Sequence, residues 1–223
     1  MYEIEIKSLL GGKDEAEELK KRLSEVDPAT KLVSRSKQLN HYFIGGSPNK
    51  LYEAAEGLLK NQDAAKLKEI IEKGEDFSVR TRELNGKILL VVKASVDDTT
   101  SSNGISRLEF EEEVNLESLE ELDKILLDAG FNYQAKWSRE REEYICRGAN
   151  VSIDKNAGYG YLAEFEKVLG EDANLEEARI ELRSLMDEVE AVELQQDRLE
   201  RMFAYYNEHW PDYYGTEKTF VIE

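Results

Sequence analysis

Charged and hydrophobic residues alternate in several short stretches of the chain, a pattern that is typical of β-strands. In residues 2–7, Ile4 and Ile6 fall on one face of such a strand and Glu5 and Lys7 on the other, because successive side chains of a strand point to opposite faces. The alternation recurs in three later stretches: residues 80–82, 107–111 and 164–166. Charges of both signs at matching positions predict a sheet that closes around a charged interior, with helices over its apolar outer face.

Further strands are predicted by runs of apolar and β-branched residues that end at glycine or polar turns. They cover about 31–44, 76–84, 87–96, 105–114, 132–147, 150–155 and 160–168. Asn85-Gly86 joins two of them, and this dipeptide is a strong signal for a hairpin turn. Residues 31–44 form either one strand with an irregular start or a hairpin. Residues 97–104 are expected to form a polar loop, and residues 218–223 an edge strand or a tail.

Apolar positions repeat at helical spacing in the rest of the chain. Helices are predicted over about 14–26, 50–73, 116–129, 174–190 and 192–209. Asp14 and Asn115 are expected to cap two of these helices, since short polar side chains accept hydrogen bonds from free N–H groups at a helix start. The helical stretch 50–73 is expected to break near Asn61, and Pro211 to end the last helix. Together these elements predict an α+β fold.

The 223 residues carry a formal net charge of −18, which argues against nucleic acid or an anionic membrane as a bulk partner. A single cysteine, Cys146, excludes an internal disulfide, and two histidines, His41 and His209, are too few for a typical histidine metal site. These three residues and Trp137 are interpreted as packing or surface positions. No apolar run reaches membrane-spanning length and the N-terminus lacks the features of a signal peptide, so a cytoplasmic protein is expected.

The charged face of the predicted sheet combines acids and bases. Its carboxylates stand in Glu-x-Glu pairs: Glu3, Glu5, Glu109, Glu111, Glu164 and Glu166. Its bases are Lys7, Arg80, Arg82, Lys93 and Arg107, with Lys136, Arg139 and Arg141 further along. Hard cations such as Mg²⁺ and Mn²⁺ prefer oxygen ligands, and Arg and Lys bind phosphate, so the combination fits a polyphosphate ester or anhydride. The alternative is a set of surface ion pairs, which contribute little.

These motifs, in their order along the chain, resemble those of the CYTH superfamily, also called triphosphate tunnel metalloenzymes. Residues 3–7, Glu-Ile-Glu-Ile-Lys, resemble its Glu-x-Glu-x-Lys signature. Later segments resemble its other motifs: Arg80-Thr81-Arg82, the strand that ends at Lys93, Arg107-Leu108-Glu109-Phe110-Glu111, and Asp154 followed by Glu164-Phe165-Glu166. One such motif would be weak support, but the ordered set extends over residues 1–169.

The resemblance implies an eight-stranded antiparallel β-barrel, a tunnel that holds a triphosphate. The residues implied to hold one or two Mg²⁺ or Mn²⁺ ions are the six glutamates above and Asp154. Those implied to bind the phosphates are Lys7, Arg80, Arg82, Lys93 and Arg107. The later basic pair stays open among Lys136, Arg139 and Arg141, with the two arginines favoured. Residues expected to act in catalysis are Glu3, Glu5, Lys7, Tyr42 and Arg139, although Tyr42 equally fits simple packing on the barrel wall.

Two regions differ from shorter members of the superfamily. Residues 50–73 are expected to be a helical insertion in the barrel of residues 1–169, and residues 170–223 a helical extension packed on it. Aromatic residues between 203 and 214 are expected first of all to cover the barrel. Stacking on a base, or contact with a second copy of the chain in a homodimer, are the alternatives.

The expected activity is divalent-metal-dependent hydrolysis of a triphosphate small molecule, such as inorganic tripolyphosphate, thiamine triphosphate or a nucleoside triphosphate. One alternative is a class IV adenylyl cyclase, which converts ATP to cyclic AMP and pyrophosphate. The other is a non-catalytic module that binds triphosphates. The charged strands do not separate these functions, because all of them need the same contacts to phosphate.

Overall fold

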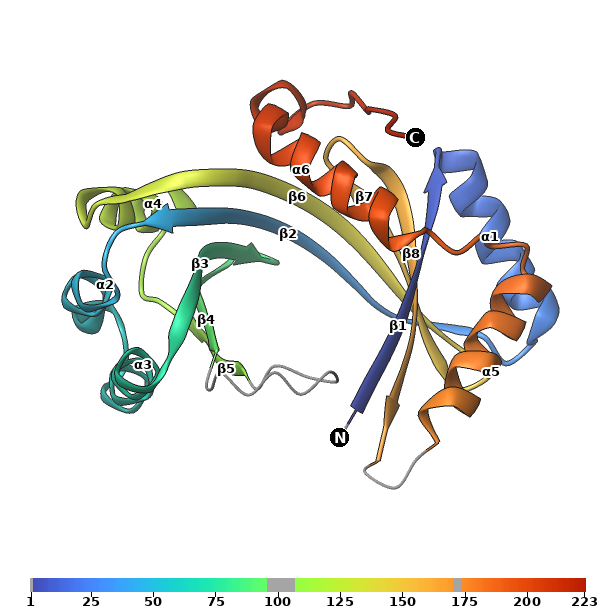
Figure 1. The fold of residues 1–223 in the computed structure, drawn as a ribbon, viewed down its shortest axis with the longest axis horizontal. Coiled ribbons are helices and arrows are strands. Elements are labelled where there is room, and N and C mark those ends of the chain that lie inside the picture. Colours follow the sequence, from blue (N-terminus) through green and yellow to red (C-terminus); the bar gives the residue numbers. More distant parts are fainter. Residues whose placement is uncertain (1, 96–106, 171–173) are drawn as a thin grey trace. The chain divides into compact units, whose positions relative to one another are not determined.

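The computed structural model describes residues 2–95, 107–170 and 174–223, with only the backbone described for residues 2, 3 and 107 (Figure 1). The predicted loop 97–104 lies outside the described residues. The chain forms two compact units, the first made of residues 1–37 and 138–223 and the second of residues 38–137. The division falls within two long strands, β2 (Lys31–Gly45) and β6 (Phe131–Cys146), which both continue from one unit into the other.

One eight-stranded sheet has the order β1-β8-β7-β6-β2-β3-β4-β5. The strands besides β2 and β6 are β1 (Tyr2–Gly11), β3 (Glu75–Leu84), β4 (Lys87–Ser95), β5 (Arg107–Glu113), β7 (Ala149–Asn156) and β8 (Gly160–Leu169). The strands pair antiparallel, which confirms the predicted α+β class with eight antiparallel strands. β1 and β5 end this order and do not pair within the described residues, so the predicted closure into a barrel is not seen in the described part of the chain.

In the first unit, helices α1 (Lys13–Val26) and α5 (Leu175–Glu188) cover the apolar face of β1, β7 and β8 (Figure 1). Ile4, Ile6 and Phe165 of the strands share this core with Leu23 of α1 and Leu182 of α5. Burying one such side chain stabilises the fold by about 1.5–3 kcal/mol. The apolar half of the alternating pattern therefore turns toward the helices and leaves the charged half on the opposite face.

Helix α6 (Gln196–Tyr213) also belongs to the first unit, and it contains Pro211 instead of ending before it. Proline removes its own N–H from the helix and crowds the preceding turn, but the helix continues past it to Tyr213, and Tyr214 N donates to Trp210 O at 2.8 Å. The residues after α6 form a tail, because only an isolated bridge joins Thr219 to Gly158. Among the helices of the described residues, none is long and apolar enough to span a bilayer.

In the second unit, helices α2 (Pro48–Ala55), α3 (Asn61–Lys73) and α4 (Leu119–Asp128) pack on the apolar face of β3, β4 and β5. Leu51, Leu67 and Leu122 of these helices are fully buried with Leu90 and Phe110 of the strands. A 3₁₀ turn over Glu56–Leu58 separates α2 from α3. The helical stretch is thus interrupted as predicted, but several residues earlier, and Asn61 begins α3.

Both predicted helix caps are wrong, whereas the predicted hairpin turn is correct. Gly12 precedes α1 without a side-chain cap, and Asp14 lies in the first turn, where its charge favours the helix dipole. Ser118, not Asn115, caps α4 by accepting from Glu121 N at 3.3 Å. Asn85 and Gly86 have φ values of 51° and 84°, as a type I′ turn requires.

Candidate functional site

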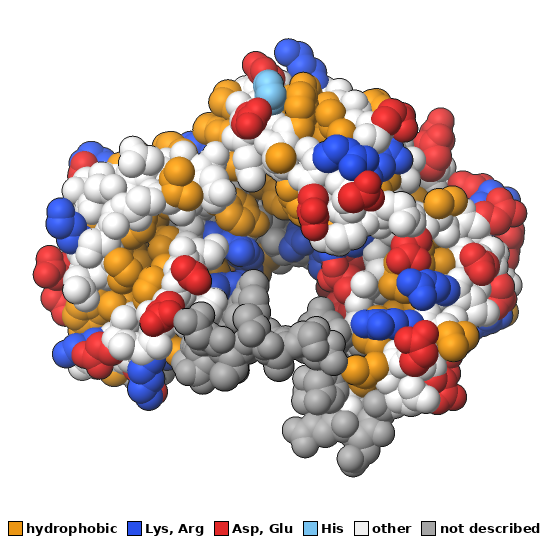
Figure 2. Space-filling model, in the orientation of Figure 1, with side chains coloured by type: hydrophobic (Ala, Val, Ile, Leu, Met, Phe, Trp, Pro, Cys, Tyr) orange, Lys and Arg blue, Asp and Glu red, His pale blue; other side chains and the backbone are white. Residues whose placement is uncertain are grey.

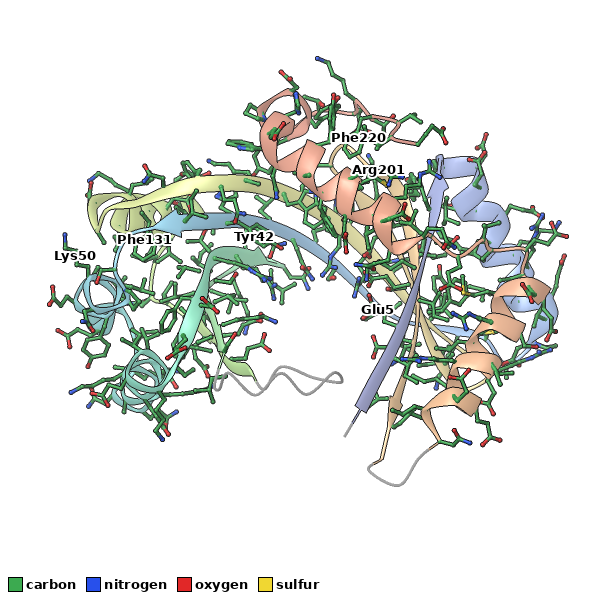
Figure 3. The ribbon with its side chains drawn as sticks, viewed as in Figure 1. Glu5, Tyr42, Lys50, Phe131, Arg201 and Phe220 are labelled. Atoms are coloured by element: carbon green, nitrogen blue, oxygen red, sulfur yellow. The ribbon has the colours of Figure 1, made fainter. Side chains whose placement is uncertain are left out.

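The polar face of the first unit is built on the pairing of β1 with β8. Glu5 lies directly opposite Glu166, and Lys7 lies directly opposite Glu164; Glu5 is labelled on β1 in Figure 3. Lys7 forms ion pairs with Glu5 and with Glu164, the latter with 3.1 Å between Nζ and Oε1. The charged residues predicted from two distant segments are therefore neighbours on one face.

Strands β6 and β7 extend this face with a buried arginine–carboxylate cluster. Arg141 donates to both oxygens of Asp154, from Nε at 2.7 Å and from Nη2 at 2.6 Å, and it also contacts Glu164. Arg139 Nη1 lies 3.5 Å from Asp154 Oδ2. Asp154 is 2% exposed, and a two-pronged guanidinium contact is among the strongest that such a carboxylate can make.

The charges around Glu164 keep it ionised. Burial raises the pKa of Glu164, but the positive charges of Arg141 and Lys7 outweigh burial and hold this pKa below its ordinary value. Ser152 Oγ also donates to Glu164 Oε2 at 3.3 Å. Glu164 is thus a partly buried, ionised carboxylate that two bases share, and it could bind a cation if those bases moved to another partner.

The carboxylates of this face match the ligands that Mg²⁺ or Mn²⁺ prefers. Glu5 and Glu166 are directly opposed, and like charges in that position destabilise a sheet unless something neutralises them. Within the described part of the chain, no group of three Asp, Glu, His or Cys side chains is already arranged around a metal position. The donor chemistry fits a divalent ion, and Glu5, Glu164 and Glu166 are the residues that would hold it.

The polar face of the second unit carries the two arginines of the Arg-x-Arg motif. Arg82 donates from Nε to Asn40 Oδ1 at 2.7 Å and from Nη1 to Glu111 Oε1 at 2.6 Å. The Arg80 guanidinium carbon lies 4.5 Å from the centre of the Tyr42 ring, and Figure 3 labels Tyr42 on β2. Cross-strand pairing explains both contacts, since Asn40 is opposite Arg82 and Tyr42 is opposite Arg80.

Strands β4 and β5 complete this second face. Lys93 lies directly opposite Glu109, with 2.7 Å between Nζ and Oε1. Trp137 meets the Tyr42 ring edge-on, with 6.4 Å between the ring centres. The second unit therefore presents two guanidinium groups, one ammonium group and an aromatic pair from its polar face.

The structure brings most of the predicted site residues into two groups, one in each unit. The first group is Glu5, Lys7, Arg139, Arg141, Asp154, Glu164 and Glu166, and the second is Tyr42, Arg80, Arg82, Lys93, Glu109 and Glu111. Lys136 instead lies 3.8 Å from Asp123 and 4.1 Å from the centre of the Tyr133 ring. The side chains of Glu3 and Arg107 lie outside the described residues.

Asn40 and Ser152 contact the predicted residues but are absent from the predicted site. Strand alternation could have indicated them, because residues two apart share a face: Asn40 lies on the face of Tyr42, and Ser152 on the face of Asp154. Neutral side chains carry no charge pattern, so only the contacts single them out. Trp137, predicted to be structural, lies against a candidate site residue.

Outside this site, charges of both signs are mixed on the helices. Figure 2 shows acidic and basic side chains interspersed over α1 and α5. Two ion pairs of α5 are of this kind: Glu188 Oε1 lies 2.6 Å from Nη1 of Arg147, in the turn after β6, and Arg183 Nε lies 2.9 Å from Oε2 of Glu193. Because these pairs are exposed, each contributes little to stability. The helices therefore offer no continuous patch of one sign on the face shown.

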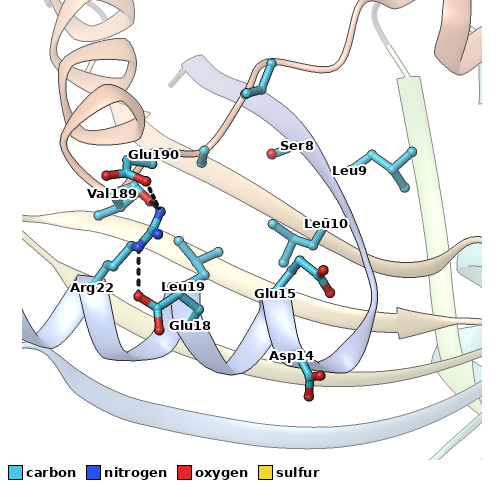
Figure 4. Close-up of a pocket in the computed structure, with 12 residues that line it drawn as sticks. Ser8, Leu9, Leu10, Asp14, Glu15, Glu18, Leu19, Arg22, Val189 and Glu190 are labelled. Atoms are coloured by element: carbon cyan, nitrogen blue, oxygen red, sulfur yellow. Dashed lines mark hydrogen bonds and ion pairs between the residues drawn. The ribbon is translucent and has the colours of Figure 1, made fainter.

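A cavity of about 390 Å³ lies beside α1, between the end of β1 and residues 189–192 (Figure 4). Leucines and acidic residues line it, and Arg22 forms ion pairs there with Glu18 at 3.1 Å and Glu190 at 2.7 Å. No residue of the predicted site lines this cavity. It is distinct from the charged face of β1, because Glu5 and Lys7 are not among its walls.

No family model matches the chain, and no curated protein gives a significant match. Solved structures do match it. A Pyrococcus horikoshii protein covers 92% of this chain and 99% of its own at 18% identity, with a TM-score of 0.53. An adenylate cyclase candidate from Vibrio parahaemolyticus covers 91% of this chain and 98% of its own at 13% identity, also with a TM-score of 0.53. A conserved hypothetical protein from Pyrococcus furiosus covers 88% and 93% at 17% identity, with a TM-score of 0.52.

These likenesses extend over nearly the whole chain. Because the sequence identities are low, the likenesses establish the fold and not the activity. One of the three, the Vibrio parahaemolyticus protein, is named as an adenylate cyclase candidate. This chain therefore shares the fold of these three solved structures.

Proposed function

We propose that this protein hydrolyses a triphosphate-containing small molecule in a reaction that depends on Mg²⁺ or Mn²⁺. The observation that carries the proposal is the register of β1 and β8, which sets Glu5 opposite Glu166 and Lys7 opposite Glu164. Acids suited to a cation and bases suited to phosphate thus alternate on one face. The resemblance of the sequence motifs to the CYTH superfamily supports the same chemistry, because that superfamily includes triphosphatases.

Each unit presents bases that suit phosphate. Arg80 and Arg82 offer planar, forked donors to phosphate oxygens, and Lys93 adds a compact positive charge. Lys7 and Arg141 act in the same way in the first unit. These residues supply the local positive charge that an anionic substrate requires on a protein whose net charge is −18.

Substrate binding exchanges the partners of these bases. Lys7 and Arg141 now pair with Glu164, and Arg82 pairs with Glu111. In the complex, the bases donate to phosphate oxygens, and the carboxylates become available as ligands. A bound Mg²⁺ or Mn²⁺ would neutralise charge on the phosphates and supply an activated water molecule.

Other predicted residues orient or assist the bases that bind the phosphates. Tyr42 orients Arg80 through the contact between its ring and the guanidinium group. Asp154 holds Arg141 in a fixed direction through two hydrogen bonds. Arg139, next to the same carboxylate, adds a further positive charge. Glu3, Arg107 and Lys136 stay predictions.

An assay of the purified protein tests the reaction. The protein is incubated with Mg²⁺ or Mn²⁺ and with tripolyphosphate, thiamine triphosphate or ATP, and the products are separated. Release of orthophosphate that stops on chelation supports the proposal. Glu5→Gln should abolish turnover, whereas the control Glu140→Gln should not, because Glu140 lies on the other face of β6 and pairs with exposed Lys37. Equal loss in both variants contradicts the assigned role of Glu5.

Cyclisation of ATP is the second candidate function, and the fold likeness to the Vibrio parahaemolyticus adenylate cyclase candidate favours it. The same bases would hold the triphosphate while the ribose 3′-hydroxyl attacks the α-phosphorus and pyrophosphate leaves. Hydrolysis is preferred here because it needs only the phosphate contacts already described. Cyclic AMP as the sole product from ATP would replace the first proposal with this one.

A non-catalytic triphosphate-binding module is the remaining alternative. Such a protein would bind tripolyphosphate but release no phosphate with any metal. Calorimetric binding without turnover of any of the three substrates would favour the module.

A further inference from the structure

A buried carboxylate lies against β3, the strand of the Arg-x-Arg motif, on the face opposite to Arg80 and Arg82. Asp123 of α4 is 2% exposed. Its Oδ2 lies 2.6 Å from His41 Nδ1 and accepts from the Tyr133 hydroxyl at 2.7 Å, and its Oδ1 accepts from Thr81 Oγ1 at 2.6 Å. One helix is thereby bonded to three strands, β2, β3 and β6.

The network holds a particular cross-strand pair. His41 of β2 and Thr81 of β3 are directly opposite each other, and both are buried. Their neighbours along the two strands form the next two cross-strand pairs, Asn40 with Arg82 and Tyr42 with Arg80. Because side chains alternate across a strand, Asp123 holds the strand pair from one face while the arginines project from the other.

The carboxylate is charged in this position. Burial raises the pKa of Asp123, but the hydrogen bonds from His41, Thr81 and Tyr133 outweigh burial and bring this pKa below its ordinary value. Lys136 Nζ, at 3.8 Å from Oδ2, adds a positive charge nearby. Buried charges with several good hydrogen bonds favour one arrangement of their partners, because any other arrangement leaves the charge unpaired.

We propose that Asp123 is a positioning residue for the phosphate-binding arginines. Through Thr81 and His41 it keeps β2 and β3 in the register that places Arg82 against Asn40 and Arg80 over Tyr42. The inference rests on the proposed function, since it assigns the network to the binding of the same triphosphate. A purely structural role would stabilise the fold without changing the direction of either arginine.

Thr81→Val is the sharpest test, because valine has nearly the shape of threonine and replaces the hydroxyl that donates to Asp123 with a methyl group that cannot donate. The matched control is Tyr159→Phe, which also removes one buried hydrogen bond, from the Tyr159 hydroxyl to Met202 O at 3.2 Å, but in the first unit. Both variants should melt below the wild type. Thr81→Val alone should raise KM for the triphosphate, by about tenfold, because small displacements of binding groups are costly, and leave kcat within about twofold.

Side-chain NMR of the arginines gives a readout independent of turnover. The Arg82 Nε–Hε signal reports the bond to Asn40, so it should shift in Thr81→Val and in Asp123→Asn and stay in place in Tyr159→Phe. Thr81→Ser, which restores the hydroxyl, should restore both the signal and KM. If Asp123→Asn fails to fold, Thr81→Val carries the test.

Failure of the positioning role and failure of the proposed function give different results. A wild-type KM and an unmoved Arg82 signal in a destabilised Thr81→Val protein would overturn the positioning role. Absence of any triphosphate binding or turnover in the wild type would overturn the proposed function instead. In that case the Arg82 signal still decides whether Asp123 orients the arginine.

Discussion

Glu5 of β1 lies directly opposite Glu166 of β8. Two carboxylates in this relationship repel each other, and a pair of like charges destabilises a sheet by an amount on the order of 0.2–1 kcal/mol. Lys7, two residues beyond Glu5, pairs with Glu5 and Glu164 and offsets part of this repulsion. A divalent cation would offset more, and this difference can be measured without any substrate.

Glu166→Gln should therefore make the protein less responsive to metal. In chelator, the variant is expected to melt at or above the wild-type temperature, because one of the opposed charges has been removed. With Mn²⁺ or Mg²⁺, the wild type should gain more stability than the variant, since a ligand that binds only the folded state raises the melting temperature. Thermal melts with and without metal check this. An equal metal-induced shift in the two proteins would remove Glu166 from the ion site.

Arg80→Ala should weaken triphosphate binding by about 1.5–3 kcal/mol, the range for hydrogen bonds to charged groups. The Arg80 guanidinium contacts the Tyr42 ring and Ser78 Oγ. Neither contact is with an acidic side chain, so losing Arg80 does not take an ion-pair partner from Tyr42 or Ser78. Titration calorimetry with tripolyphosphate measures the change. Arg183→Ala is the control, because Arg183 pairs with Glu193 on the exposed surface of α5. An unchanged affinity in Arg80→Ala would remove Arg80 from the site.

Acid should weaken the attachment of α1 to the sheet. Burial raises the pKa of Glu142, but hydrogen bonds from Lys20 of α1, Arg35 and Tyr144 bring it down to about 2 from an ordinary value of 4.5. A carboxylate with a lowered folded-state pKa stabilises the fold above its unfolded-state pKa, and this contribution disappears as the pH falls toward the folded-state value.

Glu142→Gln should accordingly destabilise the protein near neutral pH, and the difference from the wild type should shrink between about pH 4.5 and pH 2. Urea unfolding at several pH values measures it. Glu140→Gln, on the same strand, serves as the comparison because Glu140 is 56% exposed and pairs with exposed Lys37. A difference independent of pH would mean that the ion pairs of Glu142 are not the cause.

Gly158→Ala should detach the C-terminal tail. Gly158 has a φ of +77°, and a Cβ there would lie 2.9 Å from both Phe220 and Tyr206. Phe220 N also donates to Gly158 O at 2.9 Å. The Phe220 ring packs on the Tyr159 ring, with 4.8 Å between the ring centres. We expect a loss of about 1–3 kcal/mol in the free energy of unfolding and faster proteolysis of residues 216–223. Val221→Ala should change neither, because Val221 is 77% exposed.

The strands were the most predictable elements of the chain. Alternation in residues 2–7 and 164–166 separated Ile4, Ile6 and Phe165 from the charged positions, and these three side chains are in the core. The Asn85-Gly86 turn was equally clear, because its backbone angles suit few other residues. Helix ends were less predictable. Asn115 and Ser118 are both good caps, and packing of Leu119 and Leu122 in the core decides that the helix begins after Ser118.

The partners of Asp123 could not be identified from the sequence. Asp123 lies four residues after Leu119 and three before Leu126, on the buried side of α4, but helical spacing does not show what a residue contacts. His41 was interpreted as a packing or surface residue without assigned chemistry. Only when α4 lies on β2 and β3 do the carboxylate and its three donors meet.

The chain's local pattern determined which residues share a face of each strand, since alternation is a property of the extended backbone itself. It thereby identified most members of both charged groups before any contact was known. Which of these residues lie opposite each other on neighbouring strands was decided by tertiary structure alone. The register of Glu5 with Glu166, and of Arg82 with Asn40, comes from hydrogen bonds between strands that are distant in sequence, and a shift of one residue would have turned each side chain to the opposite face.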